Sequence, residues 1–197
     1  MGHRHQHGCG ARPVIPAAFV TAWSARAPWP SPAQVEQDLL LSRVLIEISQ
    51  DGYLRDELVF RGGTCLHKLH LPIPRRYSED LDFVRTTTSG IAPLTAAVTA
   101  LGQHLGFSVS TRISQQPKIY LRTTAADGTA LRIKVEINTH ERSPAQPLVL
   151  MPYEVNSPWW SAKATFEPSR QLNSSLPRSG RCSSGRRVAT CSTSGSP

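Results

Sequence analysis

Three segments in the second half of the chain alternate apolar and polar residues with a period of two. They read "FSVSTRI" (107–113), "KIYLRTT" (118–124) and "LRIKVEIN" (131–138). This period is typical of strands that bury one face and expose the other. The intervening "AADGT" (125–129) has the composition of a tight turn, so the second and third segments are predicted to form a hairpin. The chain must therefore build at least part of its core on a sheet.

Helical and strand patterns alternate before these segments. "SPAQVEQDLLLSRVLIEISQDG" predicts a helix, with Ser31 as N-cap, Pro32 in the first position and Gly52 near its end. Further along, the patterns predict a short buried strand in "ELVFRGG" (57–63), a short helix over 64–70, a strand in "LDFV" (81–84) and an amphipathic helix in "IAPLTAAVTALGQHLG" (91–106). This order favours an α+β fold with a mixed β-sheet flanked by helices.

The two ends differ in composition from the middle. Residues 1–31 are rich in Pro, Ala, Gly and His without a period, which predicts a flexible N-terminal arm. His3, His5, His7 and Cys9 could hold a metal, although such a start is more typical of a flexible segment. Residues 32–167 form the predicted domain, and residues 168–197 are a basic, irregular tail.

Charge and cysteine content limit the function classes. The net charge is +8, but the whole excess lies in the ends, at Arg4, Arg12, Arg26, Arg170, Arg178, Arg181, Arg186 and Arg187. A basic total is a common sign of nucleic-acid binding, and here it comes from the tails alone. The four cysteines show no paired spacing, which favours reduced thiols in the cytoplasm. No apolar run is long enough to span a membrane.

Three carboxylates are candidates for a metal site. Asp80 and Asp82 flank Leu81, so in a strand both side chains leave the same face of the sheet. Two neighbouring carboxylates repel each other unless a positive charge lies between them. Glu136 lies in "IKVEIN", and an adjacent strand would bring it beside the pair. Such a cluster suits Mg²⁺ or Mn²⁺ and phosphoryl chemistry, while the simpler alternative for the D-x-D alone is a solvated strand edge.

A glycine pair precedes these carboxylates. Gly62 and Gly63 follow a strand and open a helix, an arrangement that lets backbone N–H groups approach a phosphate. Thr64 adds a hydroxyl group, and Lys68 lies one helical turn later on the same face. A plain turn is the alternative for the glycines alone. The order of glycine pair, lysine, D-x-D and a later strand carboxylate favours a nucleotide site.

These motifs resemble a known family. "FRGGTCLHKLH", "RRYSEDLDFV" and "IKVEIN" are similar to the AbiEii/AbiGii-type nucleotidyltransferase toxins, which include the MenT-type tRNA-modifying toxins, in the polymerase-beta-like nucleotidyltransferase superfamily. The resemblance covers roughly residues 32–167. It implies that Gly63 and Thr64 hold a nucleoside triphosphate (NTP), with Lys68 and Ser78 nearby.

The resemblance also implies a reaction and partners. Asp80 and Asp82 become the metal-binding pair and Glu136 the third carboxylate. The implied activity is transfer of a nucleoside monophosphate from NTP to an RNA end, typically a tRNA acceptor, with a cognate antitoxin as protein partner. A remnant that binds NTP or the antitoxin without catalysis is the main alternative. A basic RNA binder would rest only on the tails.

The C-terminal tail departs from the family pattern. Family members continue into a helical half with a lysine in an "ELLAxKLRAL" helix and an aspartate in an "RDLxDL" stretch, and neither motif is present here. The usual helical half is therefore expected to be missing. A disordered tail is one interpretation. The other is out-of-frame translation, because a shifted reading of GC-rich codons for "RCSSGRRVATCSTSG" gives "GRDLFDL". Sequencing the codons for residues 165–175 would decide between the two.

Ser78 and a tryptophan pair leave further alternatives. Ser78 lies two residues before Asp80 in a turn stiffened by Pro72 and Pro74. Its hydroxyl group could face the triphosphate, which would make it a candidate site of regulatory phosphorylation, or it could cap its own turn. Trp159 and Trp160 could line a nucleotide or partner surface, or could pack beneath further helices.

Overall fold

The computed structural model describes residues 15–71, 76–140 and 150–166. Its main sheet has five strands in the order β1-β2-β5-β4-β3. The strands are β1 (Leu58–Arg61), β2 (Asp80–Arg85), β3 (Ser108–Arg112), β4 (Lys118–Thr124) and β5 (Ala130–Asn138). Only β2 and β5 pair in parallel; the other three pairs of neighbours are antiparallel. The predicted α+β class with a mixed sheet is confirmed.

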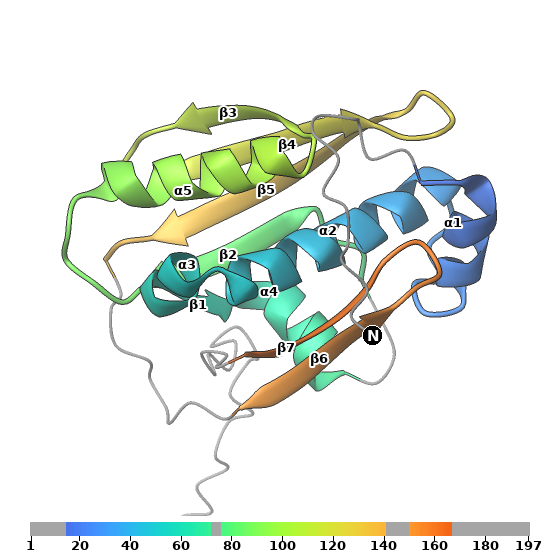
Figure 1. The fold of residues 1–197 in the computed structure, drawn as a ribbon, viewed down its shortest axis with the longest axis horizontal. Coiled ribbons are helices and arrows are strands. Elements are labelled where there is room, and N and C mark those ends of the chain that lie inside the picture. The colour runs from blue at the N-terminus through green and yellow to red at the C-terminus, as the bar shows by residue number, and fades with distance from the viewer. Residues whose placement is uncertain (1–14, 72–75, 141–149, 167–197) are drawn as a thin grey trace, which may run out of the picture.

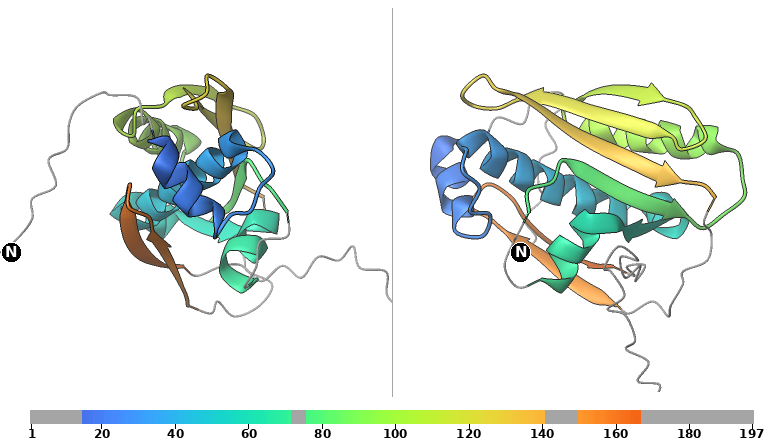
Figure 2. Two further views of the ribbon diagram at one scale, coloured as in Figure 1. Left: turned by 90° about the vertical axis from the view of Figure 1, so that its right-hand side faces the viewer. Right: turned by 180° about the vertical axis from the view of Figure 1, so that it is seen from behind.

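Two helices cover one face of this sheet. Helix α2 (Pro32–Gln50) and helix α5 (Ile91–His104) lie in front of the strands in Figure 1. The strands present their apolar residues to these helices and form the core, with Leu81, Phe83, Ile119, Leu121, Ile133, Val135 and Ile137 all buried. Seen from behind, the other face of β3, β4 and β5 carries no covering helix (Figure 2). The period-two pattern thus reports a sheet that is buried on one side only.

Helix α2 is the centre of the molecule. The backbone N–H of Ser31 donates to Gln34 Oε1 at 3.3 Å and Pro32 occupies the first turn, as the capping signals predict. A hairpin of β6 (Met151–Asn156) and β7 (Ser161–Phe166), which the patterns do not predict, packs against the side of α2 away from the sheet (Figures 1 and 2). Because α2 is enclosed from several sides, even Glu36 and Asp38 on it are buried.

The predicted flexible arm is wrong for its second half. Residues 17–24 form helix α1 (Ala17–Ser24), and Ile15, Val20 and Trp23 are buried against the core. Composition suggested disorder, but Trp23 Nε1 donates to Asp38 Oδ1 at 3.0 Å and ties the segment to α2. Tertiary contacts therefore order a segment that has no helical period of its own. The N-terminal His and Cys residues lie outside the described residues, as does the tail from 167 onward.

Three short helical segments surround the glycine pair. Helix α3 (Gly52–Glu57) joins α2 to β1, and helix α4 (Gly62–Cys65) follows β1 directly. The chain then widens into a π-helical turn, η1 (Leu66–His70). Cys65 is buried and unpaired, and burial raises the pKa of its thiol to about 12. In the described part of the chain, no helix has the length and apolar character needed to cross a membrane.

Candidate nucleotide and carboxylate site

The glycine pair and the first carboxylates meet at the junction of β1 and β2. Arg61, the last residue of β1, is registered opposite Asp82, so Gly62, which follows it, lies directly beside that aspartate. Gly62 has φ of +81°, and a Cβ atom at this position would lie 2.4 Å from Asp82 Oδ2. Only glycine allows both this backbone conformation and this close approach. Gly63 lies beside Arg76, whose Nη2 would be 3.3 Å from an added Cβ.

Parallel pairing of β2 with β5 brings in the third carboxylate. Asp80 is registered with Lys134 and Asp82 with Glu136, so the predicted placement of Glu136 beside the pair is correct. The strand pairing also brings a residue that the sequence analysis missed. Lys134 Nζ lies 3.0 Å from Asp80 Oδ2 and 3.1 Å from Glu136 Oε2. Its position two residues before Glu136, on the same strand face, was the signal that could have identified it.

Lysines neutralise part of this carboxylate cluster. Burial opposes ionisation of Glu136, but hydrogen bonds and charge from Lys134 and Lys118 lower its pKa overall. Hydrogen bonds to Asp80 and Glu136 outweigh the burial of Lys134 and raise its pKa. Asp82 differs from these residues. Burial, then the charges of Asp80 and Glu136, raise its pKa. Asp82 is therefore the carboxylate whose negative charge is least compensated.

The fit of a divalent cation follows from this arrangement. Asp80 and Asp82 leave one strand face as hard oxygen donors, and burial together with the charges of Asp80 and Glu136 raises the pKa of Asp82, a repulsion that a cation between the pair would offset. Glu136 is held by two lysines. Within residues 15–71, 76–140 and 150–166, no three His, Cys, Asp or Glu side chains gather closely enough to hold a metal. The arrangement fits a cation at the Asp80–Asp82 pair, and Glu136 as its third ligand stays a prediction.

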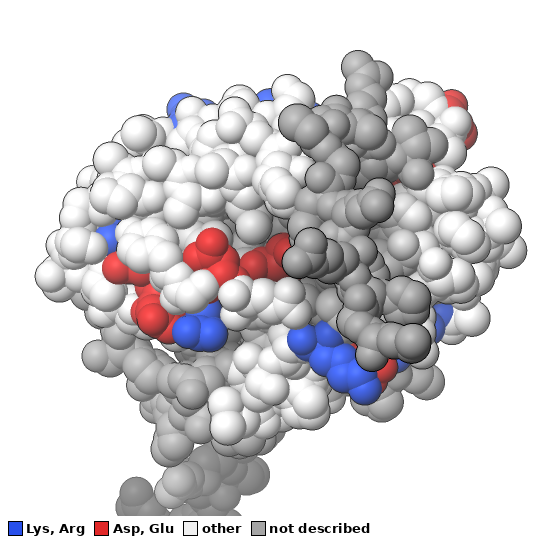
Figure 3. Space-filling view, viewed as in Figure 1, with Lys and Arg blue, Asp and Glu red and all other residues white. Residues whose placement is uncertain are grey.

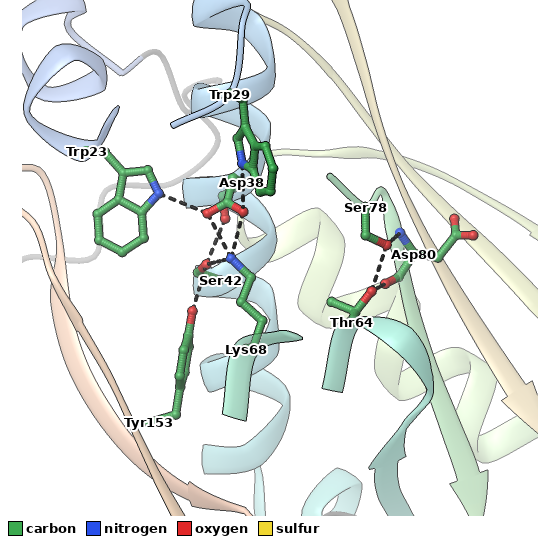
Figure 4. A network of polar contacts seen from close by, with 9 residues as sticks. All are labelled: Trp23, Trp29, Asp38, Ser42, Thr64, Lys68, Ser78, Asp80 and Tyr153. Carbon is green, nitrogen blue, oxygen red and sulfur yellow. Dashed lines mark hydrogen bonds and ion pairs between the residues drawn. The ribbon is translucent and has the colours of Figure 1, made fainter. Parts of the chain in front are cut away.

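Thr64 and Ser78 connect the glycine turn to β2. Thr64 Oγ1 donates to the carbonyl of Asp80 at 2.7 Å and lies 2.7 Å from Ser78 Oγ (Figure 4). The backbone N–H of Asp80 donates to Ser78 Oγ at 3.3 Å. Ser78 thus makes the turn-capping contact, which was one of its two alternatives. These contacts fix the start of β2 and thereby the direction of the Asp80 side chain.

Lys68 lies away from this cluster. Its ammonium group is 2.8 and 2.7 Å from the two oxygens of Asp38 and 3.0 Å from Ser42 Oγ, on the other side of Figure 4 from Thr64 and Ser78. The predicted placement on the face of Thr64 assumed α-helical spacing. In the π-helical turn η1, residues four apart no longer align, and Lys68 turns toward α2.

Two cavities lie outside the carboxylate cluster. The larger, of about 490 Å³, opens between β1, β2 and β7 and is lined by residues that include Phe60, Phe83 and Phe166. The smaller, of about 120 Å³, borders Asp38, His67 and Lys68. Trp159 and Trp160 line neither of these cavities. Instead, the guanidinium of Arg43 on α2 lies 5.1 and 5.5 Å from their ring centroids.

The comparisons with known proteins cover the region of the chain that contains this site. Residues 43–166, which contain the glycine pair and all three carboxylates, match the family of nucleotidyl transferase AbiEii toxins of type IV toxin–antitoxin systems. The chain belongs to the AbiEii family. Within that family, the elements that position Gly62, Asp80, Asp82 and Glu136 are the matched part of this chain.

A solved structure supports the fold of this AbiEii family member. MenT4, a nucleotidyltransferase toxin from Mycobacterium tuberculosis H37Rv, superposes with a TM-score of 0.57 at 23% sequence identity. The alignment covers 78% of this chain and 54% of MenT4, so this chain spans about half the length of that structure. No curated protein sequence matches the chain.

A pair of glycine substitutions tests the close approach at Gly62. Gly62 and Gly128 have φ values of +81° and +87°, but an added Cβ at Gly128 meets nothing within 4 Å. Both substitutions to Ala therefore incur backbone strain of about 1–2 kcal/mol, and Gly62→Ala adds the collision with Asp82. Urea unfolding should show the larger loss of stability for Gly62→Ala. Equal losses would contradict the packing of Asp82 on the glycine turn.

Proposed function

We propose that this chain is a toxin that transfers a nucleoside monophosphate from NTP to the 3′ acceptor end of an RNA, most simply a tRNA, and so blocks translation in the cytoplasm. One observation carries the proposal. The Gly62–Gly63 turn lies against Asp82, so a nucleotide held at the turn would have its phosphates beside the D-x-D pair. Membership of a nucleotidyltransferase toxin family supports the reaction class and an antitoxin as partner.

The residues of the site divide the work of such a transfer. The backbone N–H groups at Gly63 and Thr64 and the guanidinium of Arg76 offer positive groups to the phosphates. The RNA hydroxyl oxygen forms a bond to the α-phosphorus, the bond to the β-phosphate oxygen breaks, pyrophosphate leaves, and the hydroxyl proton passes to a base. Mg²⁺ or Mn²⁺ bound by Asp80 and Asp82 would supply charge that offsets the negative transition state. Lys134 and Thr64 keep Asp80 in position.

The direct test is incubation of the chain with Mg²⁺, each labelled NTP and total tRNA, followed by separation of the RNA. Labelled RNA supports the proposal, and the label identifies the NTP used. Binding of labelled NTP without transfer would favour the alternative, a module that holds NTP or the antitoxin. Absence of both NTP binding and transfer would contradict the proposal.

Ser78 offers a route to regulation of this site. A phosphate group on Ser78 would place about −1.5 to −2 charge next to Thr64 and the start of β2, where the phosphates of NTP are proposed to bind. We expect Ser78→Ala to weaken NTP binding modestly and Ser78→Asp to remove it, as measured by calorimetry. Ser114→Asp, in the exposed β3–β4 loop, is the control with the same added charge. Equal affinities in wild type and both Ser78 variants would show that Ser78 does not border the nucleotide.

A further inference from the structure

The open face of the sheet carries a concentration of positive charge that the net charge of the domain does not reveal. Residues 36–167 are neutral in total, but strand alternation sorts their charges between faces. On β3, β4 and β5, the face away from the helices carries five cations, Arg112, Lys118, Arg122, Arg132 and Lys134, and one carboxylate, Glu136. We call these five cations, together with Tyr120, the cationic face. No charged residue of these strands points toward the helices.

The register places like charges directly opposite one another. Arg122 on β4 is paired with Arg132 on β5, and Arg112 on β3 is paired with Lys118 on β4. Like charges directly opposite across a sheet are destabilising. Ion pairs of Arg132 with Glu79 and of Lys118 with Glu136, at 3.2 and 3.4 Å, offset part of this electrostatic cost, so the cost that remains lies mainly with Arg112 and Arg122. A polyanion lying across the strands would remove that cost.

An aromatic ring lies among these cations. The guanidinium groups of Arg122 and Arg132 lie 5.2 and 5.9 Å from the centroid of the Tyr120 ring. Arg122 also donates to Ser110 Oγ on β3. The ring and these contacts hold two flat guanidinium groups at the surface, with 52% of the Arg132 side chain exposed. Flat cationic and aromatic groups on a sheet are the surface on which single-stranded RNA stacks its bases and rests its phosphates.

The cationic face leads directly to the carboxylates. Tyr120 is registered with Lys134, and Lys134 is registered with Asp80. Three interstrand spacings, about 14 Å in total, separate β3 from β2. The surface on the far side of the molecule differs, since acidic side chains gather there over α2 and α3 (Figure 3).

We infer that the cationic face binds the single-stranded end of the acceptor RNA and guides it across β3, β4 and β5 to Asp80 and Asp82. This inference rests on the proposed function for the role of the RNA, but the surface itself can be tested without catalysis. Its occupant is a nucleic-acid single strand, because a row of cations with an interleaved aromatic ring matches a phosphate backbone with stacking bases.

Binding is measured with a fluorescein-labelled RNA of about 12 nucleotides that ends in a 3′-deoxynucleotide and cannot accept a transferred group. Arg112→Gln and Arg122→Gln should each weaken binding several-fold and lower the slope of log affinity against log salt by about 0.7 per lost phosphate contact. Tyr120→Ala should weaken binding about tenfold, whereas Tyr120→Phe should retain it. Arg55→Gln, on exposed α3, is the matched control and should bind like wild type.

Each outcome decides the inference. RNA affinity that falls in the Arg112, Arg122 and Tyr120→Ala variants but not in Arg55→Gln supports it, even if no NTP is ever transferred, in which case only the proposed function fails. Affinity that is unchanged in these variants, or reduced equally in Arg55→Gln, overturns it. Binding of wild type to phosphatidylserine vesicles but not to RNA also overturns it. Full transfer to limiting tRNA by the Arg112→Gln, Arg122→Gln double variant would overturn the surface and leave the proposed function standing.

Discussion

Asp82→Asn is expected to lose nucleotidyl transfer by about 1,000-fold and, without metal, to fold more stably than wild type. A bound cation supplies several kcal/mol of charge stabilisation to a phosphoryl transition state, and each 1.36 kcal/mol changes the rate tenfold. Asp82 lies beside the Gly62 turn, so its replacement by an amide removes a metal-binding carboxylate where the phosphates are proposed to bind. Single-turnover assays with labelled NTP and tRNA measure the loss.

The gain in stability has a defined pH dependence. Burial and the charges of Asp80 and Glu136 raise the folded-state pKa of Asp82 above its ordinary 3.8. Below pH 3.8 the side chain is neutral in both states and incurs no cost. The cost in folding free energy develops above pH 3.8, where Asp82 ionises in the unfolded state. It reaches its full size once the pH has risen through the raised folded-state pKa. Melting temperatures of Asp82→Asn and wild type should therefore differ more at pH 7 than at pH 3.

The control for this substitution is Asp127→Asn in the β4–β5 turn. Asp127 is fully exposed, and hydrogen bonds from Thr129 lower its pKa even though the charge of Glu36 lies nearby, so the fold stabilises its charge rather than opposing it. The Asp127→Asn substitution should leave nucleotidyl transfer unchanged and should not stabilise the fold. Undiminished transfer by Asp82→Asn would refute a metal role for the D-x-D pair. A melting temperature that does not rise at pH 7 would refute the crowding of its carboxylates.

Lys68→Met is expected to destabilise the fold by about 3–5 kcal/mol, because it leaves Asp38 charged and buried without its cation. The exposed fractions of the two side chains are 8% and 5%. Among the described residues, the side-chain donors left to the Asp38 carboxylate would be the indole N–H groups of Trp23 and Trp29. Adding Asp38→Asn to Lys68→Met should recover part of the loss, since no charge is buried and the amide oxygen still accepts from one of the two indoles, which donate to different oxygens of Asp38. Urea unfolding of both single variants and the double variant measures the coupling.

The stabilisation from this pair should be constant over the neutral range. Burial opposes the charge on each partner. The charge and hydrogen bonds of Lys68 nevertheless lower the pKa of Asp38, and contacts with Tyr153 and Asp38 raise that of Lys68. The contribution of Asp38 is present above 3.8 and lost as the pH falls through its lowered folded-state pKa. The contribution of Lys68 is present below 10.5 and lost as the pH rises through its raised folded-state pKa.

Lys163→Met is the surface control for Lys68→Met. Lys163 pairs with Glu154 at 3.3 Å, but 75% of its side chain is exposed, so its loss should matter little. A loss for Lys68→Met no larger than that for Lys163→Met would contradict the buried pair. NTP affinity, measured where Lys68→Met is still folded, separates this structural role from the phosphate contact that the sequence predicts. Unchanged affinity assigns Lys68 to the fold alone.

The sequence predicts those parts of the fold in which local pattern and tertiary environment agree. Strands β4 and β5 bury one face and expose the other, so their period of two is read directly. Helix α2 carries its capping residues at its start. The arm could not be predicted, because α1 is ordered by Trp23 reaching Asp38 rather than by its own pattern. The β6–β7 hairpin was missed, although Tyr153 in it reaches Ser42 of α2 at 3.0 Å.

The residues of the candidate site likewise fall into those that the sequence predicts and those that it does not. Gly62, Asp80, Asp82 and Glu136 come together because strand alternation and strand pairing fix their faces. The alternation follows from sequence spacing, whereas the pairing of β2 with β5 is a property of the fold that spacing does not determine. Lys68 was misplaced because a π-helical turn changes which residues share a face. Lys134 was not predicted although it shares the strand face of Glu136. A pattern of metal-binding carboxylates does not include the cation that lies between Asp80 and Glu136.

The parallel pairing of β2 with β5 determines when the site can exist during synthesis. A ribosome releases the glycine turn and both aspartates well before Lys134 and Glu136, and pairing between segments so distant in the sequence forms late in folding. A nascent chain that ends before β5 has two crowded aspartates, no lysine between them and no neighbouring strand to hold them. Under the proposed function, competence for transfer should therefore arise only after residue 138 has left the ribosome and β5 has docked, when most of the sheet is complete.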